Sequence, residues 1–339
     1  MILSRMHIES FRGMNGVSLK DLAPVSLLMG ANNTGKSSVL EAASLLLRPL
    51  DSSQWIQTAR LRDMDMSLPD ALWSLFPSGT RLVLDDGPKQ TTPLKIAGNV
   101  ASDERFLSAV CLANMGWDRA DEPAIRIESK VNDLPSHTME FRRDVPARFG
   151  EGVPFHRCFT VTPATHRSTR NLVEHLSKAI DAGEKSLAVE LLRLFDPKVE
   201  SLDVSSSVGR EGVRVTHAIR GVVDLASFGD GMRRCAALAL ALVRSRSGLL
   251  LVDELEAAIH PAILPEILKH LFSAAELADV QILATTHSLE AVDAVIESSR
   301  NAPDRVASYY LQRDDKSHIV RRYAMERLVE LRESGVDLR

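Results

Sequence analysis

The chain has 339 residues, of which 45% are hydrophobic and 25% are charged, and its formal net charge is −4. This composition is typical of a folded globular protein, and it excludes a disordered chain and a protein that coats nucleic acid by bulk charge. The three cysteines are widely spaced without a CxxC pair, and the longest apolar run is residues 235–243. We therefore expect no disulfide frame, zinc site or membrane span, and a cytoplasmic protein.

The first fifty residues show a strand, a second strand and a helix. Residues 2–11 mostly alternate apolar and polar side chains, which predicts an edge strand. Residues 25–29 are almost wholly apolar, as is typical of a buried parallel strand. Residues 36–47 place apolar side chains on one face and stop just before Pro49, which predicts a helix.

The pattern is weaker in residues 51–149, where short strands are predicted only at 82–84 and 125–127. Residues 172–195 have a helical period that breaks near Gly183, so we expect two short helices there.

Strands and helices alternate in the last third of the chain. Residues 199–204 and 213–219 predict a hairpin. The elements predicted after it are a helix at 232–243, a strand at 249–252, a helix at 263–277, a strand at 281–286 and a helix at 289–296. This alternation predicts a parallel, doubly wound sheet.

A glycine-rich segment joins the predicted strand 25–29 to the predicted helix 36–47. It fits GxxxxGK[ST] and reads Gly30, Ala31, Asn32, Asn33, Thr34, Gly35, Lys36, Ser37, followed by Ser38. Glycine allows the positive φ values with which consecutive backbone N–H groups point at phosphate oxygens. Lys36 reaches the β- and γ-phosphates and the Ser37 hydroxyl ligates Mg²⁺ in such a loop. A plain glycine turn is the alternative, but the flanking strand and helix favour a P-loop that binds ATP and Mg²⁺.

Two acids end the predicted strand 249–252. Acids at the carboxyl ends of buried strands lie where an open α/β sheet binds its ligands. We therefore assign Asp253 to Mg²⁺ and Glu254 to the attacking water as its general base. His287 follows the next predicted strand, and the parallel topology places it beside these acids, where it can contact the γ-phosphate.

A segment of small residues precedes the predicted helix 232–243. Ser227, Gly229, Asp230 and Gly231 leave a hydroxyl and backbone N–H groups free at a helix N-terminus, which is a second anion site. An ordinary capped helix start is the alternative. The position about twenty residues before the acidic strand favours a signature segment.

These motifs together resemble the ATPase heads of the SMC, RecF and OLD group, relatives of ABC transporter ATPases, and most closely the compact bacterial OLD-like ATPases. The resemblance rests on the P-loop with its Asn32–Asn33 pair, the signature segment, the acidic strand end and further runs at residues 8–13, 253–261, 284–288 and 335–339.

The resemblance implies an α/β P-loop ATPase head of the ABC/SMC type, with a doubly wound, mostly parallel sheet, an antiparallel β lobe and a helical lobe. Residues 1–50 and 150–339 would form this discontinuous head, and residues 51–149 an inserted lobe. The signature segment of one subunit would close over ATP on the P-loop of another, with residues 256–260 at the seam of this homodimer. Arg12 would contact the nucleotide.

The chain also departs from its relatives. It has no sustained heptads for the coiled-coil arms of SMC proteins. Too few residues follow His287 for the nuclease domain of OLD proteins, and Asp63 and Asp65 are a weak nuclease signal, so an effector nuclease or toxin is expected on another chain. The family's glutamine sensor is not placed, with Gln54 and Gln57 as candidates. The resemblance implies a role in anti-phage defence or a mobile-element system.

Two other functions stay open. One is a nucleotide-gated adaptor with little turnover, which intact Glu254 and His287 disfavour. The other is a RecF-like DNA-processing head, for which Arg157, His166, Arg167 and Arg170 are a candidate basic patch. Balanced charge over the chain favours a solvated face for these four residues, and the net charge does not indicate nucleic acid.

Overall fold

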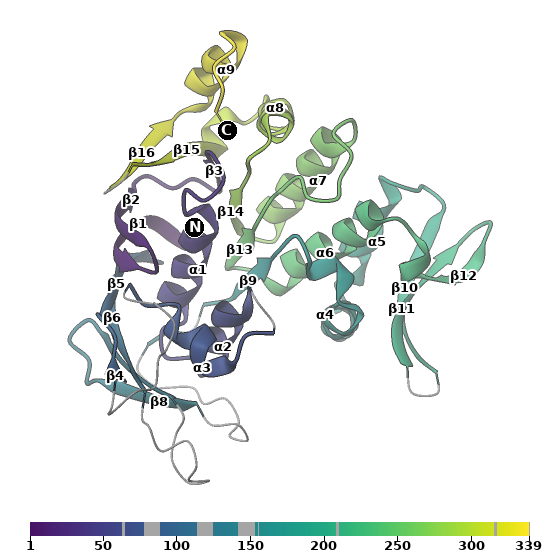
Figure 1. The fold of residues 1–339 in the computed structure, drawn as a ribbon. Coiled ribbons are helices and arrows are strands. Elements are labelled where there is room, and N and C mark those ends of the chain that lie inside the picture. Colours follow the sequence, from purple (N-terminus) through teal and green to yellow (C-terminus); the bar gives the residue numbers. More distant parts are fainter. Residues whose placement is uncertain are drawn as a thin grey trace.

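The computed structural model describes residues 1–62, 65–77, 89–113, 125–141, 153–154, 156–207, 210–314 and 317–338. Four layers follow one another through the molecule: an antiparallel sheet, a central helix, a mostly parallel sheet, and a group of helices on its far face (Figure 1). The strand predicted at 82–84 lies outside the described residues, and so does Asp63.

The central sheet has six strands in the order β16-β15-β3-β14-β13-β9. All of its neighbours are parallel except the pair β15 and β16. Its strands are β3 (Val25–Met29), β9 (Cys158–Val161), β13 (Leu249–Val252), β14 (Gln281–Thr285), β15 (Val306–Arg313) and β16 (His318–Tyr323). Every residue of β3, β13 and β14 is buried, which explains why these three strands appear in the sequence as continuous apolar runs.

Successive side chains of the central sheet enter two different cores. Leu250 and Val252 of β13 pack in the core on the side of α6 and α7, whereas Leu249 and Leu251 pack in the core on the side of α1. The helices around the sheet are α1 (Lys36–Leu47), α6 (Asp230–Arg244), α7 (Leu264–Leu277), α8 (Leu289–Ser298) and α9 (Met325–Glu333). The predicted doubly wound sheet is therefore confirmed.

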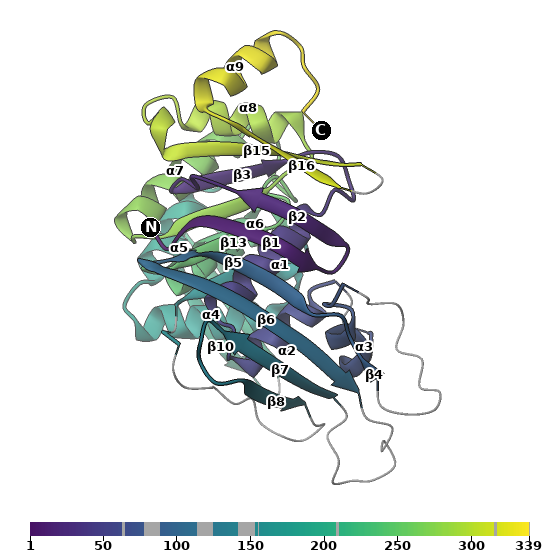
Figure 2. The ribbon, with the colours of Figure 1, turned by 90° about the vertical axis from the view of Figure 1, so that its left-hand side faces the viewer.

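The antiparallel sheet runs in the order β2-β1-β5-β6-β7-β8, with β4 paired to β6, and its strands cross Figure 2 in this sequence. Its strands are β1 (Leu3–Phe11), β2 (Met14–Leu19), β4 (Lys89–Gln90), β5 (Leu94–Val100), β6 (Asp103–Ala113), β7 (Ile125–Val131) and β8 (His137–Phe141). The expectation that residues 2–11 form an edge strand is wrong, because β1 pairs with β2 on one side and β5 on the other. Its polar residues face solvent on one face of a sheet, not at an edge.

Helix α1 lies between the two sheets, and eleven of its twelve residues are buried. This position holds the start of α1, and with it the P-loop, against both layers. Two short helices, α2 (Ser52–Arg60) and α3 (Leu68–Trp73), follow α1. Residues 51–149 thus add helices beside α1 and strands to the sheet that β1 and β2 begin.

The helical lobe packs against α6 on the far side of the central sheet (Figure 1). It contains α4 (Thr169–Asp181), α5 (Lys185–Arg193) and a three-stranded sheet of β10 (Val199–Ser207), β11 (Arg210–His217) and β12 (Gly221–Asp224). The predicted helix break and the predicted hairpin are both confirmed: Gly183 has a φ of 69° between α4 and α5, and β10 pairs with β11.

A buried amide joins the N-terminus to the central sheet. Gln281, at the start of β14, accepts hydrogen bonds from the backbone N–H groups of Ile2 and Leu3 and donates to the carbonyl oxygens of Leu3 and Ala23, at 2.7–3.1 Å. Gln281→Leu is expected to lower the free energy of unfolding by about 2–4 kcal/mol, because buried backbone groups lose their partners. Chemical denaturation checks this against the exposed Gln312→Leu, and equal midpoints for the two variants would contradict it.

Candidate nucleotide site

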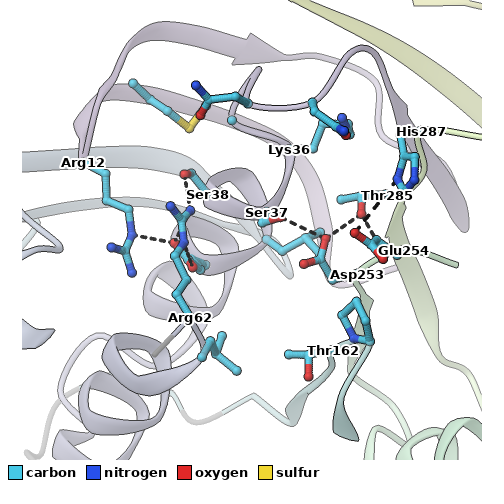
Figure 3. A pocket seen from close by; sticks show the side chains of 18 of the residues that line it. Arg12, Lys36, Ser37, Ser38, Arg62, Thr162, Asp253, Glu254, Thr285 and His287 are labelled. Atoms are coloured by element: carbon cyan, nitrogen blue, oxygen red, sulfur yellow. Dashed lines mark hydrogen bonds and ion pairs between the residues drawn. The ribbon is translucent and has the colours of Figure 1, made fainter. Parts of the chain in front are cut away.

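A pocket of about 790 Å³ lies at the carboxyl ends of the parallel strands (Figure 3). Residues from the ends of β9, β13 and β14, the loop after β3, the start of α1, and the antiparallel sheet line it. Its lining includes Arg12, Asn32, Asn33, Gly35, Lys36, Ser37, Ser38, Arg62, Thr162, Asp253, Glu254, Thr285 and His287. Local patterns far apart in the sequence therefore meet in one cavity because parallel strands end at the same edge of a sheet.

The P-loop backbone bends where the sequence has glycine. Gly30 has a φ of 137° and Gly35 a φ of 94°, and Asn33 between them also has a positive φ of 64°. A Cβ on Gly30 would lie 2.2 Å from the carbonyl oxygen of Leu311 in β15, so no side chain fits there. Asn32, Asn33 and Gly35 line the pocket, whereas Gly30 and Thr34 do not.

Lys36 is folded back onto its own loop. Its Nζ donates to the carbonyl oxygens of Gly30 at 2.7 Å and Ala31 at 2.8 Å. Burial lowers the pKa of Lys36, while the nearby carboxylates of Asp253, Glu256 and Glu254 oppose that shift. The ammonium group thus lies at the pocket near three acids. It can exchange its two carbonyl acceptors for phosphate oxygens.

Asp253 is the centre of a hydrogen-bond group at the pocket floor. Its Oδ1 accepts from the Ser37 hydroxyl at 3.0 Å and from the Thr285 hydroxyl at 2.6 Å. The Thr285 hydroxyl oxygen also accepts from the backbone N–H of Glu254 at 2.9 Å. The P-loop helix, β13 and β14 are therefore joined through one carboxylate.

The backbone turns at Glu254, two residues after the end of β13. Glu254 has a φ of 49°, an uncommon conformation for a residue with a side chain, and its carboxylate is about half exposed. His287 Nδ1 lies 4.0 Å from Oε1 of Glu254 and 3.6 Å from Oε1 of Glu256. The turn thus points an acid into the pocket beside an imidazole, as the parallel topology predicted.

Ser37 and Asp253 fit a magnesium ion. Mg²⁺ prefers oxygen ligands and keeps several waters, so one hydroxyl, one carboxylate and phosphate oxygens suffice. Asp253, Glu254 and Glu256 together carry more negative charge than Lys36 and Arg234 neutralise, which favours a cation at this end of the pocket. Among the described residues, no group of three or more His, Cys, Asp or Glu side chains is placed to hold a metal ion.

Arg12 faces the pocket and forms an ion pair with Glu41, an acid that was not predicted from the sequence. Buried Glu41 of α1 accepts from Arg12 Nε at 2.6 Å and from Arg62 Nε at 2.8 Å. Arg62 Nη2 also donates to the Ser38 hydroxyl at 2.6 Å. Both guanidinium groups line the pocket one helical turn beyond the P-loop (Figure 3).

Glu41→Gln is expected to lower the free energy of unfolding by about 2–4 kcal/mol, because it leaves a largely buried Arg12 cation without its counter-charge. The matched control is Glu9→Gln, which removes an exposed pair with Lys95 and should change stability by about 0.5 kcal/mol or less. Urea denaturation of both variants measures the difference, and similar losses in the two would contradict the structural role of Glu41.

The signature segment lies apart from the pocket of its own chain. Ser227, Gly229, Asp230 and Gly231 are absent from the pocket lining, and the first three are exposed. The Ser227 hydroxyl donates to the carbonyl oxygen of Asp224 at 2.7 Å. A Cβ on Gly231 would lie 3.0 Å from the carbonyl oxygen of Ala258, so the signature segment packs against the segment that follows Glu254.

Arg234 joins the signature helix α6 to the acidic strand end. Its side chain is fully buried, and Nη2 donates to the carbonyl oxygens of Asp253 and Glu254, each at 3.0 Å. Its Nη1 donates to the carbonyl oxygen of Thr162, at the end of β9. Burial lowers the pKa of this arginine to about 10. The first turns of α6 are thereby fixed to the backbone that carries both acids.

Sequence reasoning missed several of these residues. The structure adds Glu41, Arg62, Thr162, Thr285 and Arg234 to the site or its support. Gln54 and Gln57, the candidates for the glutamine sensor, do not line the pocket: Gln54 is buried and donates to Thr58, and Gln57 is exposed. The carboxyl end of β9, where Thr160 and Thr162 line the pocket, was not predicted as a strand end at all.

The fold and the site define the class: an ABC/SMC-type P-loop ATPase head of the RecF- and OLD-like group. The chain belongs to the family described as "AAA domain, putative AbiEii toxin, Type IV TA system", whose model matches residues 113–293, more than half of the chain. A second model, described as "Protein of unknown function (DUF2813)", matches residues 1–58.

Individual relatives agree with this class. A Helicobacter pylori protein named ATP/GTP phosphatase is 19% identical over 96% of this chain and 97% of its own length. The DNA replication and repair protein RecF of Acinetobacter baylyi is 44% identical over 46 residues, 14% of this chain and 13% of RecF. The fold is similar to an SMC head solved with the C-winged helix domain of ScpA, with a TM-score of 0.53, 14% identity and coverage of 96% of this chain and 99% of that one.

No helix in the described part of the chain combines the length and the apolar character that a bilayer span requires.

Proposed function

We propose that this chain binds ATP with Mg²⁺ and hydrolyses it as a head-to-head homodimer, and that closing and opening of the dimer drives or gates a separate effector protein. The observation that carries the proposal is the hydrogen-bonded group of Ser37, Asp253 and Thr285, with Glu254 next in the chain. This group has the hydroxyl, the carboxylate and the adjacent acid that phosphoryl transfer to water needs.

Nucleotide binding would begin at the P-loop. Lys36 would exchange the carbonyl oxygens of Gly30 and Ala31 for β- and γ-phosphate oxygens, and the backbone N–H groups of the loop would donate to the same phosphates. Ser37 and Asp253 would hold Mg²⁺, which neutralises phosphate charge when bound.

Hydrolysis would use the acid that the turn after β13 exposes. Glu254 would accept a proton from water as the water oxygen attacks the γ-phosphorus and the bond to the bridging oxygen breaks, which gives ADP and phosphate. His287, whose Nδ1 lies 4.0 Å from Oε1 of Glu254, would hydrogen-bond the γ-phosphate beside this general base.

The dimer would complete the site. Ser227, Gly229, Asp230 and Gly231 do not line the pocket of their own chain and are mostly exposed, which supports action on the nucleotide of a second copy. The contact between Gly231 and Ala258 supports residues 256–260 as part of the same dimer seam. The Ser227 hydroxyl would turn from the carbonyl of Asp224 to donate to phosphate.

A similar structure supports a partner chain, because the similar SMC head is bound to the C-winged helix domain of ScpA. For this chain we propose a nuclease or toxin as the effector, in a cytoplasmic anti-phage or mobile-element system. We also propose residues 1–50 and 150–339 as the head and 51–149 as its insert.

Ser227→Ala tests the shared site. We expect roughly 10²-fold slower ATP hydrolysis from the loss of one phosphate donor, with nucleotide affinity unchanged. An equimolar mixture with Lys36→Ala should recover up to about a quarter of the wild-type rate per chain, since half of the dimers then hold one intact site. Steady-state phosphate release measures both. A mixture as inactive as its two components would place the signature segment outside a shared site.

A further inference from the structure

Two guanidinium groups and one imidazole surround a single carboxylate of the signature segment. Arg167 Nη2 lies 3.5 Å from Oδ2 of Asp230, Arg233 Nη1 lies 3.4 Å from its Oδ1, and His166 Nε2 lies 3.6 Å from its Oδ2. One carboxylate neutralises one of the two guanidinium charges. The cluster of Arg167, Arg233 and Asp230 therefore keeps a net positive charge even with His166 neutral.

The side chains of Arg167 and Arg233 differ in their exposure to solvent. Arg233 belongs to the same helix as Asp230, three residues later, and its side chain is 17% exposed. Arg167 comes from the short helix η1 (Thr165–Arg167), and its side chain is 70% exposed. At 3.5 Å its bond to Asp230 is at the long limit, and an exposed ion pair of this kind is weak. Arg167 can therefore leave Asp230 for another anion while Arg233 stays.

The cluster also contains a buried imidazole, His166, whose ring makes no hydrogen bond within the described residues. Burial lowers the pKa of His166. Its Nε2 lies 3.6 Å from Oδ2 of Asp230, just beyond hydrogen-bond distance, so a buried ring borders the carboxylate that both arginines contact.

The start of α6 adds to the same positive face. This helix has fifteen residues and begins at Asp230, and Gly229 before it has no side chain to cap the first turn. Uncapped N–H groups at the start of a long helix favour an anion. The signature segment and Arg167 thus present their donors together.

The anion does not come from the pocket of the same chain. Thr162, Pro163 and Ala164 line that pocket, but the chain then leaves it, and Arg167 is absent from the lining. The structure also divides the basic patch predicted from sequence. Arg157 comes just before β9, at the amino ends of the parallel strands, where it packs against Gly248. His166 and Arg167 follow β9, beyond its carboxyl end.

We propose that Arg167 acts in trans on the triphosphate held by the P-loop of a second copy of this chain. The proposal rests on the shared-site dimer proposed above, and adds to it a residue outside the signature segment. On dimer closure the Arg167 guanidinium exchanges Asp230 for two γ-phosphate oxygens, to which it donates two parallel N–H bonds. Asp230 keeps Arg233, and the charge that develops on the transferring phosphoryl group is stabilised by an arginine of the other subunit.

The first test is Arg167→Ala in the full chain, with Arg170→Ala as a matched control, because Arg170 is an exposed arginine three residues away. We expect Arg167→Ala to lower kcat by roughly 10²-fold or more, with the Kd for ATP at the P-loop unchanged. Arg170→Ala should keep the wild-type rate. Mixed with Lys36→Ala, the Arg167→Ala chain should regain activity, since each mixed dimer then contains one intact composite site. No recovery on mixing would mean that Arg167 acts within its own chain.

A second test separates direct contact from support of the signature segment. If Arg167 only held Asp230 in place, Asp230→Ala and the double variant Asp230→Ala/Arg167→Ala would hydrolyse ATP equally slowly. We expect the double variant to be at least about tenfold slower than Asp230→Ala alone. Equal rates would overturn the proposal.

The outcomes also separate this inference from the dimer on which it rests. An inactive wild type, or one whose Lys36→Ala and Ser227→Ala variants do not complement, contradicts the shared site itself. An active, complementing protein in which Arg167→Ala keeps the full rate contradicts only the role of Arg167. If that variant instead lost affinity for a DNA oligonucleotide, the cluster would be a nucleic-acid surface and the proposal would be wrong.

Discussion

Glu254→Gln is expected to lower kcat for ATP hydrolysis by roughly 10²–10⁴-fold while nucleotide affinity stays near that of the wild type, because the amide keeps the shape of the side chain but cannot accept the proton of the attacking water. The contacts of Glu254 explain why only the rate should change. Glu254 is held through its N–H by Thr285 and through its carbonyl by Arg234, and neither contact involves the carboxylate. The ATP-bound dimer should therefore still form and should accumulate.

Glu266→Gln is the control for this variant, since Glu266 is an exposed acid in the first turn of α7. Phosphate release and sedimentation in the presence of ATP measure rate and dimer together. Full activity of Glu254→Gln would assign the base to another group, with Glu256 as the nearest carboxylate to His287.

Lys36→Ala is expected to raise the Kd for ATP by roughly 10²-fold or more, because charge-assisted hydrogen bonds to phosphate contribute about 1.5–3 kcal/mol each. Lys36 also offsets the charges of Asp253, Glu254 and Glu256, so its removal increases their repulsion of a triphosphate. Titration with a fluorescent ATP analogue measures the change.

The exposed Lys20→Ala is the control for nucleotide binding, and circular dichroism checks that both variants fold. Folding needs this check because Lys36 also bonds two carbonyl oxygens of its own loop. Normal ATP affinity in a folded Lys36→Ala protein would contradict the assignment of the P-loop.

Much of the site was predictable because its main parts are local patterns. The P-loop, the acids after β13 and His287 after β14 each follow a fully buried strand, and an apolar run followed by a polar group is visible in one stretch of sequence. Parallel strands end at one edge, so the meeting of these groups follows from topology.

The residues that sequence reasoning missed depend on contacts between distant segments. Glu41 lies between apolar neighbours on α1, and its partners are 29 residues before it and 21 residues after it. Arg234 reaches backbone carbonyl oxygens, which carry no mark in the sequence. The second neighbour of β1 is β5, about ninety residues away, so the interior position of β1 could not be recognised from its alternation.

The basic residues near β9 were predicted from the sequence to form a solvated face. Arg167 and Arg170 are exposed, as expected of a solvated face. What the sequence could not reveal is that Asp230, more than sixty residues later, lies against Arg167 and His166 and brings them to the signature segment.

In the proposed mechanism, two copies of this chain share each site of ATP hydrolysis. Steady-state ATP hydrolysis per chain, measured over a wide range of protein concentration with Glu254→Gln as the inactive control, tests it most directly. The shared site predicts a rate per chain that rises with concentration and reaches a plateau when the dimer is saturated. A rate per chain that is substantial at the lowest concentration and constant over the whole range, for a protein that sediments as a monomer with ATP, would contradict it.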